Sequence, residues 1–136
     1  MRIRPCCADD LEGLEWDGEY AHDRAAIRDT FARMLAQDMV MLVAEDCALL
    51  VGQVWLDLAR VPDATYLWAL RVREPWRGRG IASRLVTAVE HASRARGFTA
   101  IDLDLAAPSS AVRAFYERRG YVAVDSDPIR LRKRLA

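Results

Sequence analysis

The sequence predicts an α/β fold, with a mixed, mostly antiparallel central sheet of six to seven strands flanked by about four helices. Short apolar runs, some alternating with polar residues, recur along the 136-residue chain and indicate strands. Segments with apolar residues at helical spacing lie between these runs. One strand–helix–strand unit, over residues 65–105, implies a parallel pair among antiparallel neighbours. The length suits a single domain over residues 1–136.

The first half is expected to form a strand, two helices and a three-strand meander. Asp9 and Asp10 stand directly before Leu11 and Leu14, which indicates a helix start with acids in its first turn. A second helix is indicated by apolar residues that share one helical face. In chain order, the expected elements are a strand at 2–5, a helix from 9, a helix at about 22–37 and strands at 39–44, 48–58 and 65–72.

The second half is expected to alternate helices and strands. A glycine-bearing turn opens an amphipathic helix that Gly97 ends, and a second helix ends at Gly120. The strand between them alternates apolar residues with Asp102 and Asp104, which gives it one acidic face. In chain order, the expected elements are a helix from 81 to about 96, a strand at 101–105, a helix at 109–119 and strands at 121–124 and 129–135.

The formal net charge is zero, but the two halves of the chain differ in charge. Residues 1–70 hold 13 acids and 6 arginines, and residues 71–136 hold 7 acids and 14 basic residues. The zero total argues against a dedicated nucleic-acid binder. No apolar stretch reaches membrane-spanning length and no signal peptide is visible, so we expect a cytoplasmic protein without a membrane partner. The three cysteines fit no zinc spacing, and no metal is expected.

The run Arg77-Gly78-Arg79-Gly80-Ile81-Ala82 is the most specific feature of the sequence. Glycines at a helix start leave backbone N–H groups free to bind an anion, and the arginines add positive charge. A P-loop is excluded because Ile81-Ala82 replaces its Lys-Ser/Thr. A dinucleotide site is disfavoured because only 56 residues follow Gly80. Taken alone, the turn is either an anion site or simple helix punctuation.

The turn also resembles the acyl-CoA-binding motif of the GNAT N-acetyltransferase superfamily, with Arg77, Gly80 and Ala82 at its fixed positions. A second segment, from Ser109 to Tyr121, resembles the family's helix that ends in an aromatic residue, a three-residue gap, a glycine and another aromatic. The resemblance spans essentially the whole chain. Two departures concern Ser109, where many members have Asn, and Val112, where many have Ala.

The resemblance implies a GNAT-like fold and acetyl-CoA as co-substrate. The glycine turn is expected to hold the pyrophosphate, and the strand before it is expected to bond the pantetheine arm and polarise the thioester carbonyl. The expected cofactor-binding residues are Leu70, Arg71, Val72, Arg77, Gly78, Arg79, Gly80, Ile81, Ala82, Ser83 and Ser109.

The resemblance also implies the catalytic residues. Tyr116 occupies the family's general-acid position, where it would protonate the departing thiolate; the alternative is a core aromatic. Asp104 is the expected base for the amine, with Asp102 as second candidate; the alternative is a pair of solvated carboxylates. Acids at 15, 17 and 19 lie in the segment that borders the acceptor groove in the family.

The function expected is acetyl transfer from acetyl-CoA to a primary amine by direct attack. The acceptor is a small molecule or a protein amine, at an N-terminus or a lysine, and the sequence does not identify it. A homodimer is compatible with the family. The alternative function is a non-catalytic acyl-CoA-binding sensor or partner module.

Overall fold

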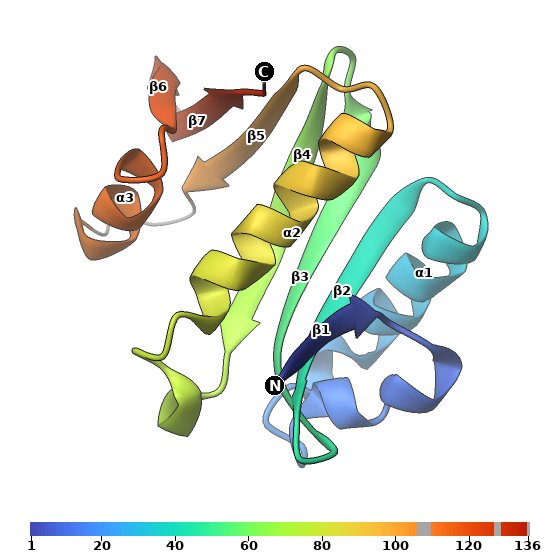
Figure 1. Cartoon of the computed structure of the whole chain (residues 1–136). Coiled ribbons are helices and arrows are strands. Elements are labelled where there is room, and N and C mark those ends of the chain that lie inside the picture. The colour runs from blue at the N-terminus through green and yellow to red at the C-terminus, as the bar shows by residue number, and fades with distance from the viewer. Residues whose placement is uncertain (106–109, 127–128, 136) are drawn as a thin grey trace.

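The computed structural model describes residues 1–105, 110–126 and 129–135. Its centre is a seven-stranded sheet in the order β1-β2-β3-β4-β5-β7-β6 (Figure 1). The strands are β1 (Arg2–Pro5), β2 (Met39–Asp46), β3 (Leu49–Val61), β4 (Ala64–Val72), β5 (Ala100–Leu105), β6 (Val122–Ser126) and β7 (Ile129–Arg134). The helices are α1 (Arg24–Leu35), α2 (Ile81–Ala95) and α3 (Ser110–Glu117). Short 3₁₀ turns are η1 (Ala8–Asp10), η2 (Gly13–Glu15), η3 (Ala21–Asp23) and η4 (Glu74–Trp76). The predicted mixed, mostly antiparallel sheet is confirmed.

The sheet opens between β4 and β5, its parallel pair. Only Thr65 and Tyr66 of β4 pair with β5, opposite Ile101 and Asp102. Beyond these residues the two strands diverge, as Figure 1 shows. A bulge in β4 accompanies the divergence, because the register advances three residues on β4 but two on β3 between the Trp68 pair and the next one. Ala69, within the bulge, has φ of +54°. The strands therefore form a V whose open end meets the start of α2.

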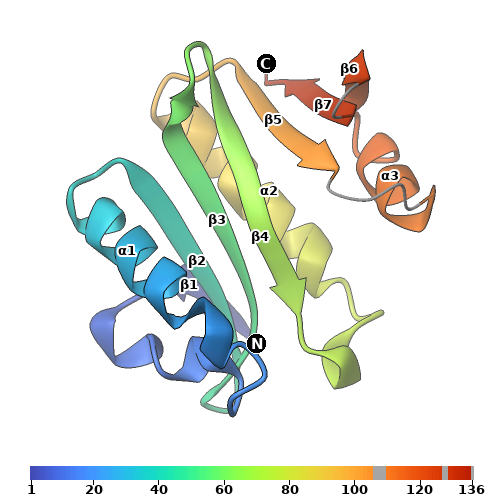
Figure 2. The same cartoon turned by 180° about the vertical axis from the view of Figure 1, so that it is seen from behind.

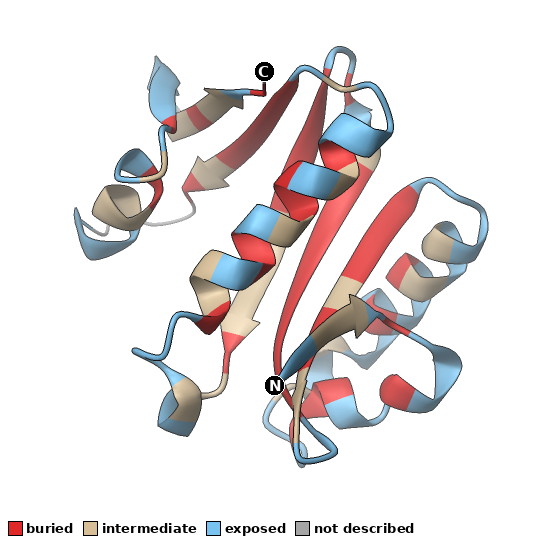
Figure 3. Cartoon of the chain, in the orientation of Figure 1, coloured by how far each residue is buried: buried red, intermediate tan, exposed pale blue. Residues whose placement is uncertain are grey.

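Helices cover the two faces of the sheet unequally. α2 lies along one face, and α1 with η1, η2 and η3 lies on the other (Figures 1 and 2). The sheet-facing side of α2 and the central strands are buried, while the outward side of α2 is exposed (Figure 3). The buried apolar residues of α2 are those that the helical spacing predicted: Ile81, Leu85, Val86 and Val89.

The helix predicted to start at Asp9 is replaced by two short 3₁₀ turns. Asp10 was expected in the first turn of this helix, but its carboxylate also pairs with other groups. It accepts hydrogen bonds from Arg4 at 2.7 and 2.8 Å and from the Cys7 N–H at 2.8 Å. Trp16 then adopts a left-handed φ of +48°, which ends η2. Side-chain pairing therefore overrides the local helical signal. None of the described helices is both long and apolar enough to span a membrane.

Candidate active site

The glycine turn delivers the free N-terminus of α2 to the open end of the V. Gly78 and Gly80 have φ of +76° and +80°, a region that side chains rarely adopt. The first N–H group of α2 with a partner inside the helix is that of Arg84, which donates to the Gly80 carbonyl at 3.1 Å. Within the described residues, no backbone hydrogen bond is recorded for the N–H groups from 78 to 83. The first turn of α2 holds no acid, so this end of the helix favours an anion.

Two arginines beside this turn, Arg77 and Arg119, carry positive charge that no carboxylate of the described residues pairs with. Arg77 Nε donates to the Val72 carbonyl at 2.9 Å. Arg119, in the turn after α3, donates to Ser83 Oγ from Nε at 3.0 Å and from Nη2 at 2.7 Å. Its Nη1 donates to the Phe115 carbonyl at 2.6 Å. Among the ion pairs of the described residues, neither arginine takes part. Arg79 is exposed.

A groove runs from the glycine turn into the V. It consists of three cavities of about 390, 390 and 440 Å³, which adjoin because they share lining residues. The first lies at the turn, the second between β4 and α3, and the third between β4 and β5. From the turn inwards, lining residues include Gly78, Gly80, Ser83, Arg119, Arg77, Val72, Leu70, Phe115, Tyr116, Tyr66, Trp68 and Asp104.

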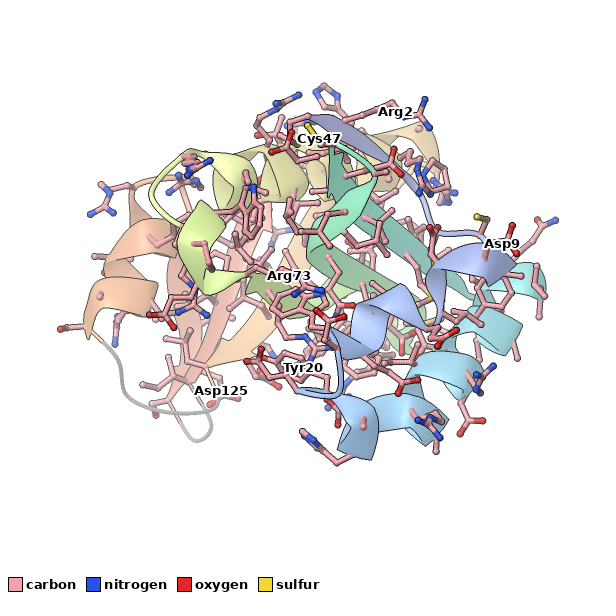
Figure 4. All side chains as sticks on the ribbon, turned by 90° about the horizontal axis from the view of Figure 1, so that it is seen from below. Arg2, Asp9, Tyr20, Cys47, Arg73 and Asp125 are labelled. Atoms are coloured by element: carbon pink, nitrogen blue, oxygen red, sulfur yellow. The ribbon has the colours of Figure 1, made fainter. Side chains whose placement is uncertain are left out.

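The end of β4 presents different groups to its two sides. Leu70 and Val72 belong to the cluster packed under α2 and line the groove. Arg71 pairs with Gln53 of β3, and its side chain reaches the α1 side. There its Cζ lies 3.7 Å from the centroid of the Tyr20 ring, and its Nη1 donates to Asp23 at 3.2 Å. Figure 4 shows Tyr20 beside this end of the sheet. β4 therefore connects the groove to the segment that precedes α1.

Tyr116 is buried in the middle of the groove. Its ring meets those of Phe115 and Tyr121 edge-on, with centroids at 5.1 and 5.4 Å. Burial raises the pKa of Tyr116 to about 12, partly opposed by the charge of Arg119. The hydroxyl therefore stays protonated at neutral pH, which is the state a general acid needs.

The two aspartates of β5 lie on the same face but differ in access. Asp104 lines the groove, accepts from Arg130 at 2.9 and 3.2 Å and accepts from the Tyr66 hydroxyl at 3.0 Å. The Arg130 hydrogen bonds, helped by Tyr66, hold the pKa of Asp104 below its usual range. Asp102 is fully buried, is paired with Arg132 at 2.6 Å and does not line the groove. Of the two, only Asp104 can meet a ligand there.

The acids at 15, 17 and 19, in the segment expected to border the acceptor groove, differ in exposure and pairing. Glu15 is buried and pairs with Arg24 at 2.9 Å. The Asp17 side chain is 91% exposed and lies 3.6 Å from Arg73. Glu19 is exposed. The segment between η2 and α1 is thus fastened to the sheet by arginine contacts.

The structure brings most expected site residues to one groove. Leu70, Arg71, Val72, Arg77, Gly78, Gly80, Ile81, Ala82, Ser83, Tyr116 and Asp104 line it. Arg79 is not among the lining residues, and Ser109 lies outside the described residues. Sequence reasoning missed Arg119, Tyr66 and Arg130. A signal existed for Arg130, because residues 129–132 alternate apolar and arginine just as 101–104 alternate apolar and aspartate.

Comparison with known proteins decides the family. The profile of the acetyltransferase (GNAT) family matches residues 8–121. The chain belongs to the GNAT family. An uncharacterized N-acetyltransferase of Bacillus subtilis, YycN, is 26% identical over 78 residues, which are 56% of this chain. The match spans half the length of that curated relative.

Solved GNAT structures share the fold over nearly the whole chain. PaiA N-acetyltransferase from Thermoplasma acidophilum, solved with coenzyme A, superposes with a TM-score of 0.77 at 20% identity and covers 98% of both chains. Ribosomal-protein-alanine N-acetyltransferase from Brucella melitensis superposes with a TM-score of 0.83 at 17% identity, over 99% of this GNAT chain and 100% of the other.

Proposed function

We propose that this GNAT protein transfers an acetyl group from acetyl-CoA to a primary amine by direct attack. One observation carries the proposal. Free N–H groups and two arginines without carboxylate partners converge at one end of a groove, and Tyr116 and Asp104 lie farther along it. A positive end and an apolar channel suit a ligand with phosphates at one end and a thioester at the other.

Acetyl-CoA would lie along the groove in one direction. Its pyrophosphate would accept hydrogen bonds from the N–H groups of Ile81, Ala82 and Ser83, with Arg77 adjacent. The pantetheine arm would follow β4, whose edge at Leu70–Val72 no longer pairs with β5. A backbone N–H of this edge would polarise the thioester carbonyl, so that charge on its oxygen is stabilised as the amine attacks.

Tyr116 is the proposed general acid. The neutral amine nitrogen forms a bond to the thioester carbon, and the carbonyl electrons move to oxygen. As the tetrahedral intermediate collapses, the carbon–sulfur bond breaks and the thiolate takes the Tyr116 proton. The tyrosinate recovers a proton from the nitrogen that becomes the amide. Burial disfavours the thiolate and the tyrosinate alike, so the raised pKa of Tyr116 is matched by a raised proton affinity of a thiolate in the same groove.

Asp104 is the proposed group that handles the acceptor's positive charge. A primary ammonium has an ordinary pKa near ~10.4 and must lose a proton before it attacks. Because Arg130 and Tyr66 already bond the Asp104 oxygens, the carboxylate is a weaker base than an isolated one. We therefore assign it to orienting the ammonium and passing the proton to water, rather than to retaining the proton.

The acceptor is proposed only as a primary amine. The related GNAT structures carry names with different acceptors, including the alanine of a ribosomal protein and aminoglycosides. The acceptor would meet the segment before α1, β5 and β7, and the fold alone does not identify which amine fits there. The class of amine therefore has to be measured.

A panel of amines with acetyl-CoA, followed by the release of free thiol, tests the proposal. It should include polyamines, amino acids, aminoglycosides and peptides with a free N-terminus. Thiol release that requires one amine and yields its N-acetyl product supports acetyl transfer. Tight binding of acetyl-CoA without thiol release for any amine would favour the alternative, a non-catalytic acyl-CoA-binding module.

A further inference from the structure

Arg119 occupies the junction between the two working parts of the groove. Its guanidinium bonds Ser83 in the first turn of α2 and the Phe115 carbonyl in α3. It also lies flat on the Phe115 ring, 3.6 Å from the ring centroid. The next residue after Phe115 is Tyr116, the proposed general acid. One side chain thus joins the anion-binding turn to the helix that carries the acid.

The Arg119 guanidinium has N–H donors without a hydrogen-bond partner in the described residues, and it has no anionic partner there. A guanidinium has five N–H donors. Three of them are used, and all three go to uncharged oxygens. Arg119 is half-buried and lines the cavity at the glycine turn. A partly desolvated cation with spare donors, next to a helix N-terminus, has the bonding of a phosphate ligand.

α3 has few other means of fixing its position against α2. It is eight residues long, and Tyr116 is its one buried residue. In the described residues, two side chains that directly follow α3 hydrogen-bond to α2: Arg119 bonds Ser83, and the Tyr121 hydroxyl donates to Glu90 at 2.9 Å. The Arg119 bond is the one at the glycine turn. A change at Arg119 would therefore be transmitted to the helix, and with it to Tyr116.

We infer that Arg119 binds the cofactor's diphosphate and thereby positions Tyr116 against the thioester. This inference rests on the proposed function. A diphosphate oxygen accepts the spare N–H groups of Arg119 while the helix N-terminus holds the same phosphate. α3 is then fixed relative to β4 when the nucleotide end is occupied. Arg119 is a positioning residue, because it acts on the reaction through Tyr116.

The nucleotide end should consequently contribute to turnover and not only to affinity. Binding energy from a part of the substrate remote from the reacting atoms can be used to orient the catalytic group. A donor that lacks the diphosphate should then react slowly even when it saturates the groove. Supplying the diphosphate as a separate molecule should restore part of the rate.

The test uses S-acetylpantetheine as donor, with and without adenosine diphosphate, and an amine found active with acetyl-CoA. In the wild-type protein, adenosine diphosphate should raise kcat with S-acetylpantetheine about tenfold. Arg119→Gln should abolish this stimulation, and Arg119→Lys should restore part of it. Arg118→Gln removes the same charge from the exposed neighbouring residue and should leave the stimulation intact.

Ser83→Ala keeps Arg119 but removes its link to α2, and it should reduce the stimulation. Unchanged melting temperatures of the variants would show that folding is not the cause. Equal stimulation in Arg119→Gln and wild type, or inhibition of the wild type by adenosine diphosphate, would overturn the inference. Failure of the wild type to acetylate any amine with acetyl-CoA would instead contradict the proposed function.

Discussion

The two ends of the groove are built from different parts of the polypeptide. At the phosphate end, the groups offered to a ligand are backbone N–H groups of one turn, set by Gly78 and Gly80. At the acceptor end, the groups are side chains from separate strands: Tyr66, Asp104 and Arg130 bond one another across β4, β5 and β7. The N–H groups of the first end are a local property of a short sequence, and folding adds Arg119 to that end. The second end exists only in the folded sheet.

The two faces of the sheet also differ in how completely polar groups are satisfied. On the α1 side of β3 and β4, five buried side chains of the described residues have a polar atom without a hydrogen-bond partner. They belong to Trp16, Gln53, Trp55, Trp68 and Arg71. Buried unpaired groups cost stability, so this side should open more readily than the α2 side.

Tyr116→Phe should have the largest effect, because it removes the proton and keeps the ring. Loss of a general acid typically costs about 10²- to 10⁴-fold in rate. We expect kcat to fall by at least about a hundredfold, while the dissociation constant of acetyl-CoA stays within about twofold. Calorimetry and steady-state kinetics measure the two quantities. Wild-type turnover in this variant would remove Tyr116 from the mechanism.

The aspartates of β5 provide a matched pair for the acceptor end. Asp104→Asn should raise the KM for the amine and lower kcat/KM about thirtyfold, with acetyl-CoA affinity unchanged. Asp102→Asn should instead lower the melting temperature, because Asp102 is fully buried and pairs with Arg132. If both variants lost kcat/KM equally at unchanged stability, the groove would not distinguish the two carboxylates.

The sequence predicted the phosphate end better than the acceptor end. Glycine and arginine at a helix start, and an aromatic helix ending in glycine, are local patterns, and the periodicity of apolar residues predicted the order of the elements along the chain. The bonds of Asp104 to Arg130 and Tyr66 depend on which strands become neighbours, and a single sequence does not encode this as a motif. Arg119 lay inside a recognised segment, but its contact with Ser83 joins residues 36 positions apart.

Gly80→Ala and Gly97→Ala introduce similar backbone strain at the two ends of α2, only one of which is the proposed phosphate site. Both glycines have positive φ, +80° and +84°, and no atom within 4 Å of an added Cβ. Each change should cost stability by about 1–2 kcal/mol. Only Gly80→Ala should also weaken acetyl-CoA binding, by about fivefold, because it distorts the N–H groups of the turn. Equal affinities in the two variants would mean that this turn does not hold the cofactor.

Acid should loosen residues 7–23, which precede α1, before it loosens α2. Pairing with Arg4 lowers the pKa of Asp10 to about 2, from an ordinary 3.8, and pairing with Arg24 lowers that of Glu15. Stability from a lowered pKa is complete above the ordinary value and is lost as pH falls through the folded one. Between pH 5 and about 2, hydrogen exchange should rise in residues 7–23 before it rises in α2. Asp10→Asn should show the faster exchange already at neutral pH.

Amide hydrogen exchange of the glycine turn on addition of coenzyme A tests the central claim most directly. If the backbone of this turn binds the pyrophosphate, saturating coenzyme A should slow exchange at Ile81, Ala82 and Ser83 by at least about tenfold. The amides of β6, at the far edge of the sheet, should be unchanged. Bound coenzyme A with unprotected amides at these three positions would contradict the account.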